Sequence, residues 1–137
     1  MIGRPLKRLI VFIQNNATGK VVLSCFIPAM IVYAIMLLYT IPRVVQYAPE
    51  MKLFDLSPTG YSYQYAIDLL STLGEKGRHL YLYQQLPLDF IYPSLFAISC
   101  CLLLSWLFAK SLDLNSKIYY LCFIPVSAGL FDYLENI

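Results

Sequence analysis

The chain has 137 residues, 59% of them hydrophobic and only 13% charged, and its formal net charge is +2. A soluble domain carries about 25% charged and about 45–50% apolar residues, and a chain this short cannot bury so much apolar surface in one core. The composition argues against a soluble domain and favours a membrane protein surrounded by the lipid bilayer. The low net charge, with no basic stripe among stacking aromatics, argues against nucleic acid as a partner.

The first long apolar run covers residues 21–41 and contains no charged residue. About 20 residues at 1.5 Å each suffice to cross a bilayer, and a membrane helix tolerates a proline such as Pro28. A cleaved signal peptide is disfavoured, because the run is too long and no small-residue cleavage site follows it. We therefore predict an uncleaved spanning helix.

The next segment predicts an amphipathic helix over residues 61–73. One apolar stripe recurs at i, i+3, i+4 and i+7, formed by Ala66, Leu69, Leu70 and Leu73. Ser57 followed by Pro58 is a start signal for this helix, and Gly74 is a natural C-terminal stop. Six tyrosines lie nearby: Tyr61, Tyr63, Tyr65, Tyr81, Tyr83 and Tyr92. Because tyrosine collects at membrane–water interfaces, we expect this helix to lie on the membrane surface within an aromatic belt.

Two further apolar runs follow. Residues 86–108 carry a single charge, Asp89, and predict a second span. Residues 118–137 reach spanning length only if their polar end is included, so a shallower packed helix is the alternative. The sequence thus predicts a single all-α membrane domain, residues 1–137, forming a helical bundle of three spans with one interfacial helix.

Lysine and arginine set the predicted orientation, because they accumulate on the cytoplasmic side. The N-terminal segment and the connection between the second and third runs hold six of the ten: Arg4, Lys7, Arg8, Lys20, Lys110 and Lys117. The loop after the first run holds the other four: Arg43, Lys52, Lys76 and Arg78. The N-terminus is therefore expected in the cytoplasm and the tyrosine-rich loop outside.

The candidate site gathers the few ionisable groups that lie in or beside the apolar runs. Residues 109–117 form a short connection, so the second and third helices should be antiparallel neighbours. At about 1.5 Å per residue, Glu135 and Asn136 then fall within roughly 3 Å of the depth of Asp89. Asp132 shares a helix face with both of them, at spacings of i, i+3 and i, i+4.

Cations are expected at the same leaflet, namely Arg43, Arg78 and His79, where opposite charges would offset the cost of placing a carboxylate there. The candidate polar cluster therefore comprises Asp89, Asp132, Glu135, Asn136, Arg78, His79 and Arg43. Three interpretations stay open: hydrated acids that mark the end of a membrane helix, a structural polar lock between helices, or a site for a cation, a proton or a lipid headgroup.

The pieces "LGEKGRHLYLYQQLPLDFIYPSLFAIS" and "IPVSAGLFDYLENI" carry a resemblance. Their pattern falls on Gly74, Gly77, Arg78, Asp89, Pro93, Pro125, Asp132, Glu135 and Asn136. It resembles small multi-pass membrane proteins of uncharacterised function, in which a membrane Asp and Pro precede a Pro…Asp-x-x-Glu-Asn helix. Those proteins continue past the Glu-Asn with more apolar residues. The resemblance therefore implies that the last helix is shortened here or that a fourth span is missing after Ile137.

The function stays open between three hypotheses. The favoured one is a non-enzymatic accessory membrane protein that pairs with another membrane protein or with itself. Gly129, in a patch of small residues, would let a helix of this chain or of another copy approach closely. The second is a membrane enzyme acting on a lipid headgroup, with Asp89, Asp132 and Glu135 holding a divalent cation and His79 as base. The third is a module that binds or senses a small ligand.

Cysteine usage gives no metal signal. Cys25, Cys100, Cys101 and Cys122 lie in apolar runs without Cys-x-x-Cys spacing, and His79 is the only histidine. Zinc needs four converging Cys or His ligands. We therefore interpret the cysteines as small buried hydrophobic residues and expect no metal or cofactor.

Overall fold

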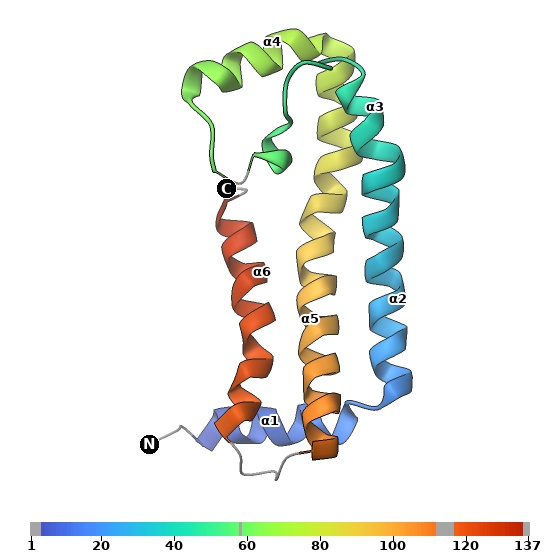
Figure 1. The fold of residues 1–137 in the computed structure, drawn as a ribbon, viewed down its shortest axis with the longest axis vertical. Coiled ribbons are helices and arrows are strands. Elements are labelled where there is room, and N and C mark those ends of the chain that lie inside the picture. Colours follow the sequence, from blue (N-terminus) through green and yellow to red (C-terminus); the bar gives the residue numbers. More distant parts are fainter. Residues whose placement is uncertain (1–3, 58, 112–116, 136–137) are drawn as a thin grey trace. The chain divides into compact units, whose positions relative to one another are not determined.

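The computed structural model describes residues 4–57, 59–111 and 117–135, and every regular element in these ranges is helical (Figure 1). The α-helices are α1 (Arg4–Asn16), α2 (Gly19–Ile35), α3 (Ile41–Val45), α4 (Tyr63–Leu80), α5 (Leu86–Ser111) and α6 (Ile124–Glu135). Two π-helical turns are η1 (Met36–Thr40) and η3 (Tyr81–Gln85), and two 3₁₀ segments are η2 (Phe54–Leu56) and η4 (Lys117–Phe123). The all-α prediction is confirmed for these residues.

Two continuous helices stand out by length. Gly19–Val45 has 27 residues and Tyr63–Ser111 has 49, and each is long and apolar enough to cross a membrane. The predicted runs 21–41 and 86–108 lie inside them. The third run forms a shorter apolar helix, Ile118–Leu134, which begins as the 3₁₀ segment η4.

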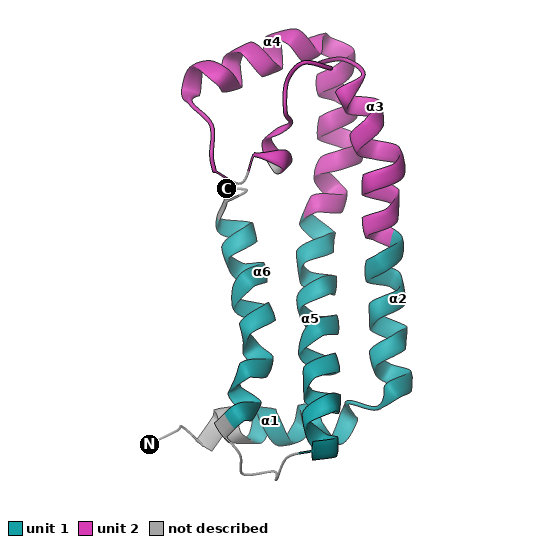
Figure 2. Ribbon diagram, in the orientation of Figure 1, with its two compact units in different colours: residues 1–31, 90–137 teal, residues 32–89 magenta. Residues whose placement is uncertain are grey.

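The chain divides into two compact units (Figure 2). Unit 1 comprises residues 1–31 and 90–137, and unit 2 comprises residues 32–89. Each unit has its own buried core and is described separately.

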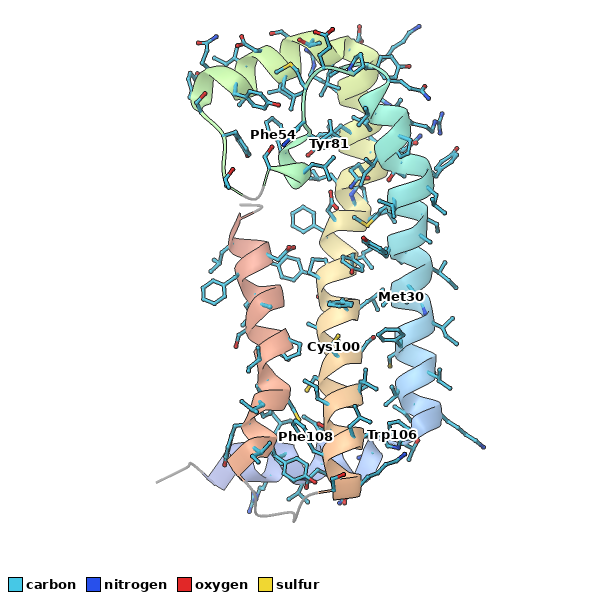
Figure 3. The ribbon with its side chains drawn as sticks, in the orientation of Figure 1. Met30, Phe54, Tyr81, Cys100, Trp106 and Phe108 are labelled. Carbon is cyan, nitrogen blue, oxygen red and sulfur yellow. The ribbon has the colours of Figure 1, made fainter. Side chains whose placement is uncertain are left out.

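The core of unit 1 joins α1, α5, η4 and α6. Ile10, Cys101, Tyr119 and Cys122 are buried together, and the Phe108 ring meets the Tyr119 ring edge-on at 6.0 Å (Figure 3). In Figure 1, α1 runs across the ends of α5 and α6. The sequence analysis identifies this N-terminal segment only by its basic charge, whereas it forms a helix with Ile10 buried and Phe12 exposed.

Gly129 settles which helix approaches the patch of small residues. A Cβ placed on Gly129 would lie 3.1 Å from the Ala97 Cβ and 3.3 Å from the Pro93 carbonyl oxygen. The neighbour of Gly129 is therefore α5 of the same chain, and the absence of a side chain is what lets α6 come so close.

The core of unit 2 forms where α4 and the loop before it fold over α3. Its buried residues are Val44, Ala48, Leu53, Leu69, Leu73 and Tyr81. Phe54 lies against Tyr81, with ring centroids 6.0 Å apart (Figure 3). Of the predicted apolar stripe of α4, Leu69 and Leu73 are buried, while Leu70 is exposed.

The start of α4 differs from the prediction, and its internal break agrees with it. Ser62, not Ser57, is the N-cap, because its side chain accepts a hydrogen bond from the Tyr65 N–H at 3.1 Å. Gly60, with φ of 81°, keeps the preceding backbone out of a helix. Gly74 has φ 61° and ψ −172°, so the helix breaks there, and the chain turns helical again toward α5.

Candidate polar site

The two π-helical turns pack against each other in unit 2. Each is closed by a hydrogen bond between residues five positions apart, from the Ile41 N–H to the Met36 carbonyl and from the Leu86 N–H to the Tyr81 carbonyl. A single π turn within an α-helix is rare and is often found at functional sites.

A proline explains why both helices widen at these turns. Pro42 follows the last residue of η1 by two positions, and Pro87 follows the last residue of η3 by two. A proline inside a helix lacks an N–H and clashes with the carbonyl four residues earlier. A wider turn relieves that clash, so the same local sequence feature produces the same distortion in both helices.

The last residues of the two turns, Thr40 and Gln85, form a buried hydrogen-bonded link. The Thr40 hydroxyl lies within hydrogen-bond distance of the Met36 carbonyl, at 3.3 Å, and donates to Gln85 Oε1. The Gln85 Nε2 group donates to both carboxylate oxygens of Asp89, each at 3.1 Å. Thr40 is 3% exposed and Gln85 is fully buried. Because buried polar groups are costly without partners, the Thr40–Gln85–Asp89 chain fixes how these two helices meet.

A second polar set lies on the same two helices. Arg43 Nη1 donates to the Tyr39 hydroxyl at 2.6 Å and to Gln84 Oε1 at 3.2 Å. The Arg43 guanidinium carbon also lies 4.8 Å from the centre of the Tyr39 ring. The guanidinium thus contacts a residue on each helix, next to the Thr40–Gln85 link.

A pocket of about 470 Å³ opens beside Arg43 in unit 2. Its lining residues are Arg43, Tyr47, Glu75, Lys76, His79 and Leu80. The volume falls within the range of small-molecule sites, roughly 300–1,000 Å³. Three of its side chains are basic or carry an imidazole, against one carboxylate.

Arg78 and His79, both predicted cluster members, have local partners. Arg78 Nη1 donates to the Leu70 carbonyl at 2.7 Å, which satisfies a carbonyl just before the break at Gly74. The His79 ring lies 4.6 Å from the Tyr83 ring. Of the predicted cluster, therefore, Arg43 and His79 line the same pocket, and Arg78 stabilises the helix break at Gly74.

The acids of α6 lie in unit 1, whereas Asp89 belongs to unit 2. Asp132 is exposed on α6. The Glu135 side chain and all of Asn136 fall outside the described residues. The meeting of Asp89 with the Asp132 group therefore stays a prediction.

Near the end of α6, a tyrosine that the sequence did not single out joins α6 to α5. The Tyr133 hydroxyl donates to the Phe90 carbonyl and lies 2.6 Å from the Ser94 hydroxyl. Its ring also stacks on Phe90, with centroids 6.2 Å apart. These contacts confirm that the second and third runs are neighbours in unit 1.

In the ranges that the structure describes, no three His, Cys, Asp or Glu side chains gather closely enough to hold a metal ion. The four cysteines there are free thiols, with Cys101 and Cys122 buried and Cys25 and Cys100 partly buried.

Comparison with known proteins adds no relative. No family model, no curated protein and no solved structure matches the chain.

Sequence reasoning missed Thr40, Gln84 and Gln85, which form hydrogen bonds between the two helices, and Tyr39, which binds Arg43 on its own helix. Their signals are present in the sequence. Gln85 and Asp89 are spaced i, i+4, as are Tyr39 and Arg43, and such pairs are neighbours on a helix. In addition, Thr40 lies two positions before Pro42, and Gln85 lies two positions before Pro87.

Proposed function

We propose that this protein is a non-enzymatic, accessory integral membrane protein whose spanning helices are held in register by the Thr40–Gln85–Asp89 link. The observation that carries the proposal is that link, a buried and hydrogen-bonded polar chain on helices whose other faces are apolar and open. Polar side chains connect helices in this way in membranes, where water cannot substitute for a lost partner.

The exposure of the long helices supports a bilayer location. In the most apolar 18-residue stretch of Gly19–Val45, only 17% is buried. In the corresponding stretch of Tyr63–Ser111, 28% is buried. Leu38, for example, is 76% exposed. Core helices of soluble proteins bury such surfaces, and large open apolar patches mark contact with a membrane or a partner.

Three spans are proposed, with the third shorter in sequence than the others. A 3₁₀ segment rises about 2.0 Å per residue and an α-helix 1.5 Å. The seven residues of η4 and the twelve of α6 therefore extend about 32 Å, close to the roughly 30 Å hydrocarbon thickness. The N-terminus is placed in the cytoplasm by the distribution of Lys and Arg, and α4 up to Leu73 lies at the outer interface.

The role as an accessory protein follows from what the link does. It orders two helices and leaves their outer faces available to lipid or to another membrane protein. The side chains of the link are hydrogen-bonded to one another, which is the arrangement expected for a structural role.

A double-mutant cycle tests the link. Gln85→Leu removes the acceptor of the Thr40 hydroxyl and a donor to the Asp89 carboxylate, so we expect a loss of about 2 kcal/mol in unfolding free energy in detergent. The Thr40→Val, Gln85→Leu double variant should lose less than the sum of the two single variants, because both single variants remove the same Thr40–Gln85 hydrogen bond. Gln46→Leu, at an exposed position, is the matched control and should be neutral.

Membrane integration is tested separately. The natural chain should stay in the pellet when isolated membranes are extracted with alkaline carbonate. Release into the supernatant would overturn the membrane proposal, whereas additive effects in the cycle would overturn only the role of the link.

A second candidate function, ligand binding, is favoured by the pocket beside Arg43. Its Arg43, Lys76 and His79 side chains suit an anionic small molecule or headgroup. Binding of a soluble phosphomonoester, measured by calorimetry on protein in detergent, should disappear in Arg43→Gln. Absence of binding to the natural chain would remove this candidate.

A further inference from the structure

A groove of about 750 Å³ lies in unit 1 between the start of α2 and the last turns of α5. Its lining residues are Thr18, Gly19, Lys20, Val22, Leu23, Phe26, Leu103 and Trp106. The walls are almost wholly apolar, and Leu23 is 57% exposed. The groove is therefore open along an apolar side and carries a cation, Lys20, on its lining.

The elbow between α1 and α2 creates this groove. A Cβ on Gly19 would come within 3.3 Å of Cζ2 of Trp106, so the glycine leaves room for the indole at the first turn of α2. The Thr18 hydroxyl accepts a bond from Val21 N–H at 3.4 Å and caps that turn. The positive end of the α2 dipole thus points toward the same end of the groove as Lys20.

A second cation sits on the indole. Lys110 Nζ lies 3.7 Å from the centre of the Trp106 ring, a cation–π contact that holds the ammonium beside the groove. Lys20 and Lys110 come from α2 and α5, and both are exposed. An apolar groove with two ammonium groups and a helix N-terminus at one end matches a ligand that has a long apolar part and an anionic head.

We propose that this groove binds one anionic phospholipid, with an acyl chain along Leu23, Phe26 and Leu103 and the phosphate facing Lys20 and Lys110. The inference rests on the proposed function, because a phospholipid reaches the groove only if unit 1 lies in a bilayer. Charge decides the class of lipid, since a zwitterionic head gains little from two lysines. The predicted cytoplasmic side is also where anionic lipids attract Lys and Arg.

Trp106 is the only tryptophan of the chain, so its fluorescence reports on this groove alone. The full chain is reconstituted in phosphatidylcholine bilayers that contain a minor fraction of brominated phosphatidylglycerol or, in parallel, of brominated phosphatidylcholine. Bromine quenches tryptophan on contact. Quenching by the anionic lipid should exceed that by the zwitterionic lipid several-fold at equal mole fraction.

Variants assign the preference to the two lysines. Lys20→Gln and Lys110→Gln should each reduce the preference for phosphatidylglycerol about fivefold, as expected for one lysine near a membrane surface. Lys110→Arg should keep it, and Lys52→Gln, at an exposed position in unit 2, should leave it unchanged. Comparing the two lipids within each variant cancels any direct effect of Lys110 on the indole. Gly19→Leu, which fills the groove beside Trp106, should abolish the preference without charge removal.

The outcomes separate the two proposals. Equal quenching by both lipids in the natural chain, or a preference that survives loss of both lysines, overturns the lipid site while the membrane protein stands. An absence of quenching by either brominated lipid overturns the membrane location itself.

Discussion

Units 1 and 2 each contain part of the two long helices, but their helices are joined by different kinds of contact. In unit 1 most of the described contacts are apolar: α6 meets α5 at Gly129, and η4 packs on α5 through buried thiol and aromatic side chains, while the Tyr133 hydroxyl adds hydrogen bonds near the end of α6. In unit 2, the helices are joined by the Thr40–Gln85–Asp89 link and the Arg43 contacts. Close packing needs only small residues and matching shapes, whereas a hydrogen-bonded link also requires particular atoms to face each other.

This contrast indicates which contacts specify the register of one helix relative to its neighbour. Apolar side chains find equivalent partners after a small slide of one helix past another, or in lipid. A buried glutamine such as Gln85, which accepts a hydrogen bond from Thr40 on the other helix, loses that partner after such a slide. We therefore expect unit 1 to be sensitive to added volume and unit 2 to be sensitive to lost hydrogen bonds and to changes at its turns.

The largest expected effect is in unit 1. Gly129→Leu places a side chain 3.1 Å from the Ala97 Cβ and against the Pro93 backbone, and overpacking of this kind costs about 3 kcal/mol. Thermal unfolding in detergent measures the loss, and hydrogen exchange should accelerate in peptides from α6. Ala128→Leu, at an exposed neighbour, should be near neutral. Equal stability of both variants would contradict the close approach of α6 to α5.

A smaller effect is expected at the bend of unit 2. Gly74 has φ 61° and ψ −172°, a conformation that is essentially restricted to glycine and strained for other residues, so Gly74→Ala should cost about 2 kcal/mol. Faster hydrogen exchange should be confined to residues 63–80. Ser71→Ala, exposed on the same helix, serves as the control. If Gly74→Ala proved as stable as the natural chain, the break at this position would be wrong.

The smallest effect compares two tyrosines of α4. The Tyr65 hydroxyl accepts from Lys52 N–H at 2.8 Å and donates to the Lys52 carbonyl at 2.9 Å, tying the preceding loop to the helix. Tyr65→Phe should cost about 1 kcal/mol and loosen the loop in hydrogen exchange. Tyr63, which is 84% exposed, is the matched position, and Tyr63→Phe should change nothing. Equal stability of the Tyr65→Phe and Tyr63→Phe variants would contradict a role of the Tyr65 hydroxyl in holding the loop.

Much of the fold follows from local sequence. The apolar runs 21–41 and 86–108 predict the long helices because an apolar stretch of that length with at most one charge is typical of a membrane-spanning helix. Gly74 predicts the break in α4 because few other residues adopt its backbone angles. The sequence analysis does not predict α1, because the basic residues of this segment mask the inward face that Ile10 and Ile13 form.

The candidate site was predicted less completely. The sequence pointed to Arg43 and Asp89, and the structure gives both of them hydrogen-bond partners, Gln84 and Gln85. Those partners are uncharged and common at many helix surfaces, so their identity alone did not distinguish them. The cap of α4 was predicted at Ser57 instead of Ser62. Any serine near the start of a helix is a candidate cap until the backbone N–H that donates to its side chain is known.

Composition and spacing along the chain are enough to predict that the chain is helical, that two stretches are long and apolar, and that few charges interrupt them, because these are local properties. The contacts of Gln85 with Thr40, of Gly129 with α5 of the same chain, and of Trp106 with Gly19 become known from the folded chain alone. Each of these contacts joins residues distant in sequence, and neither periodicity nor residue type specifies which face of one helix meets which face of another.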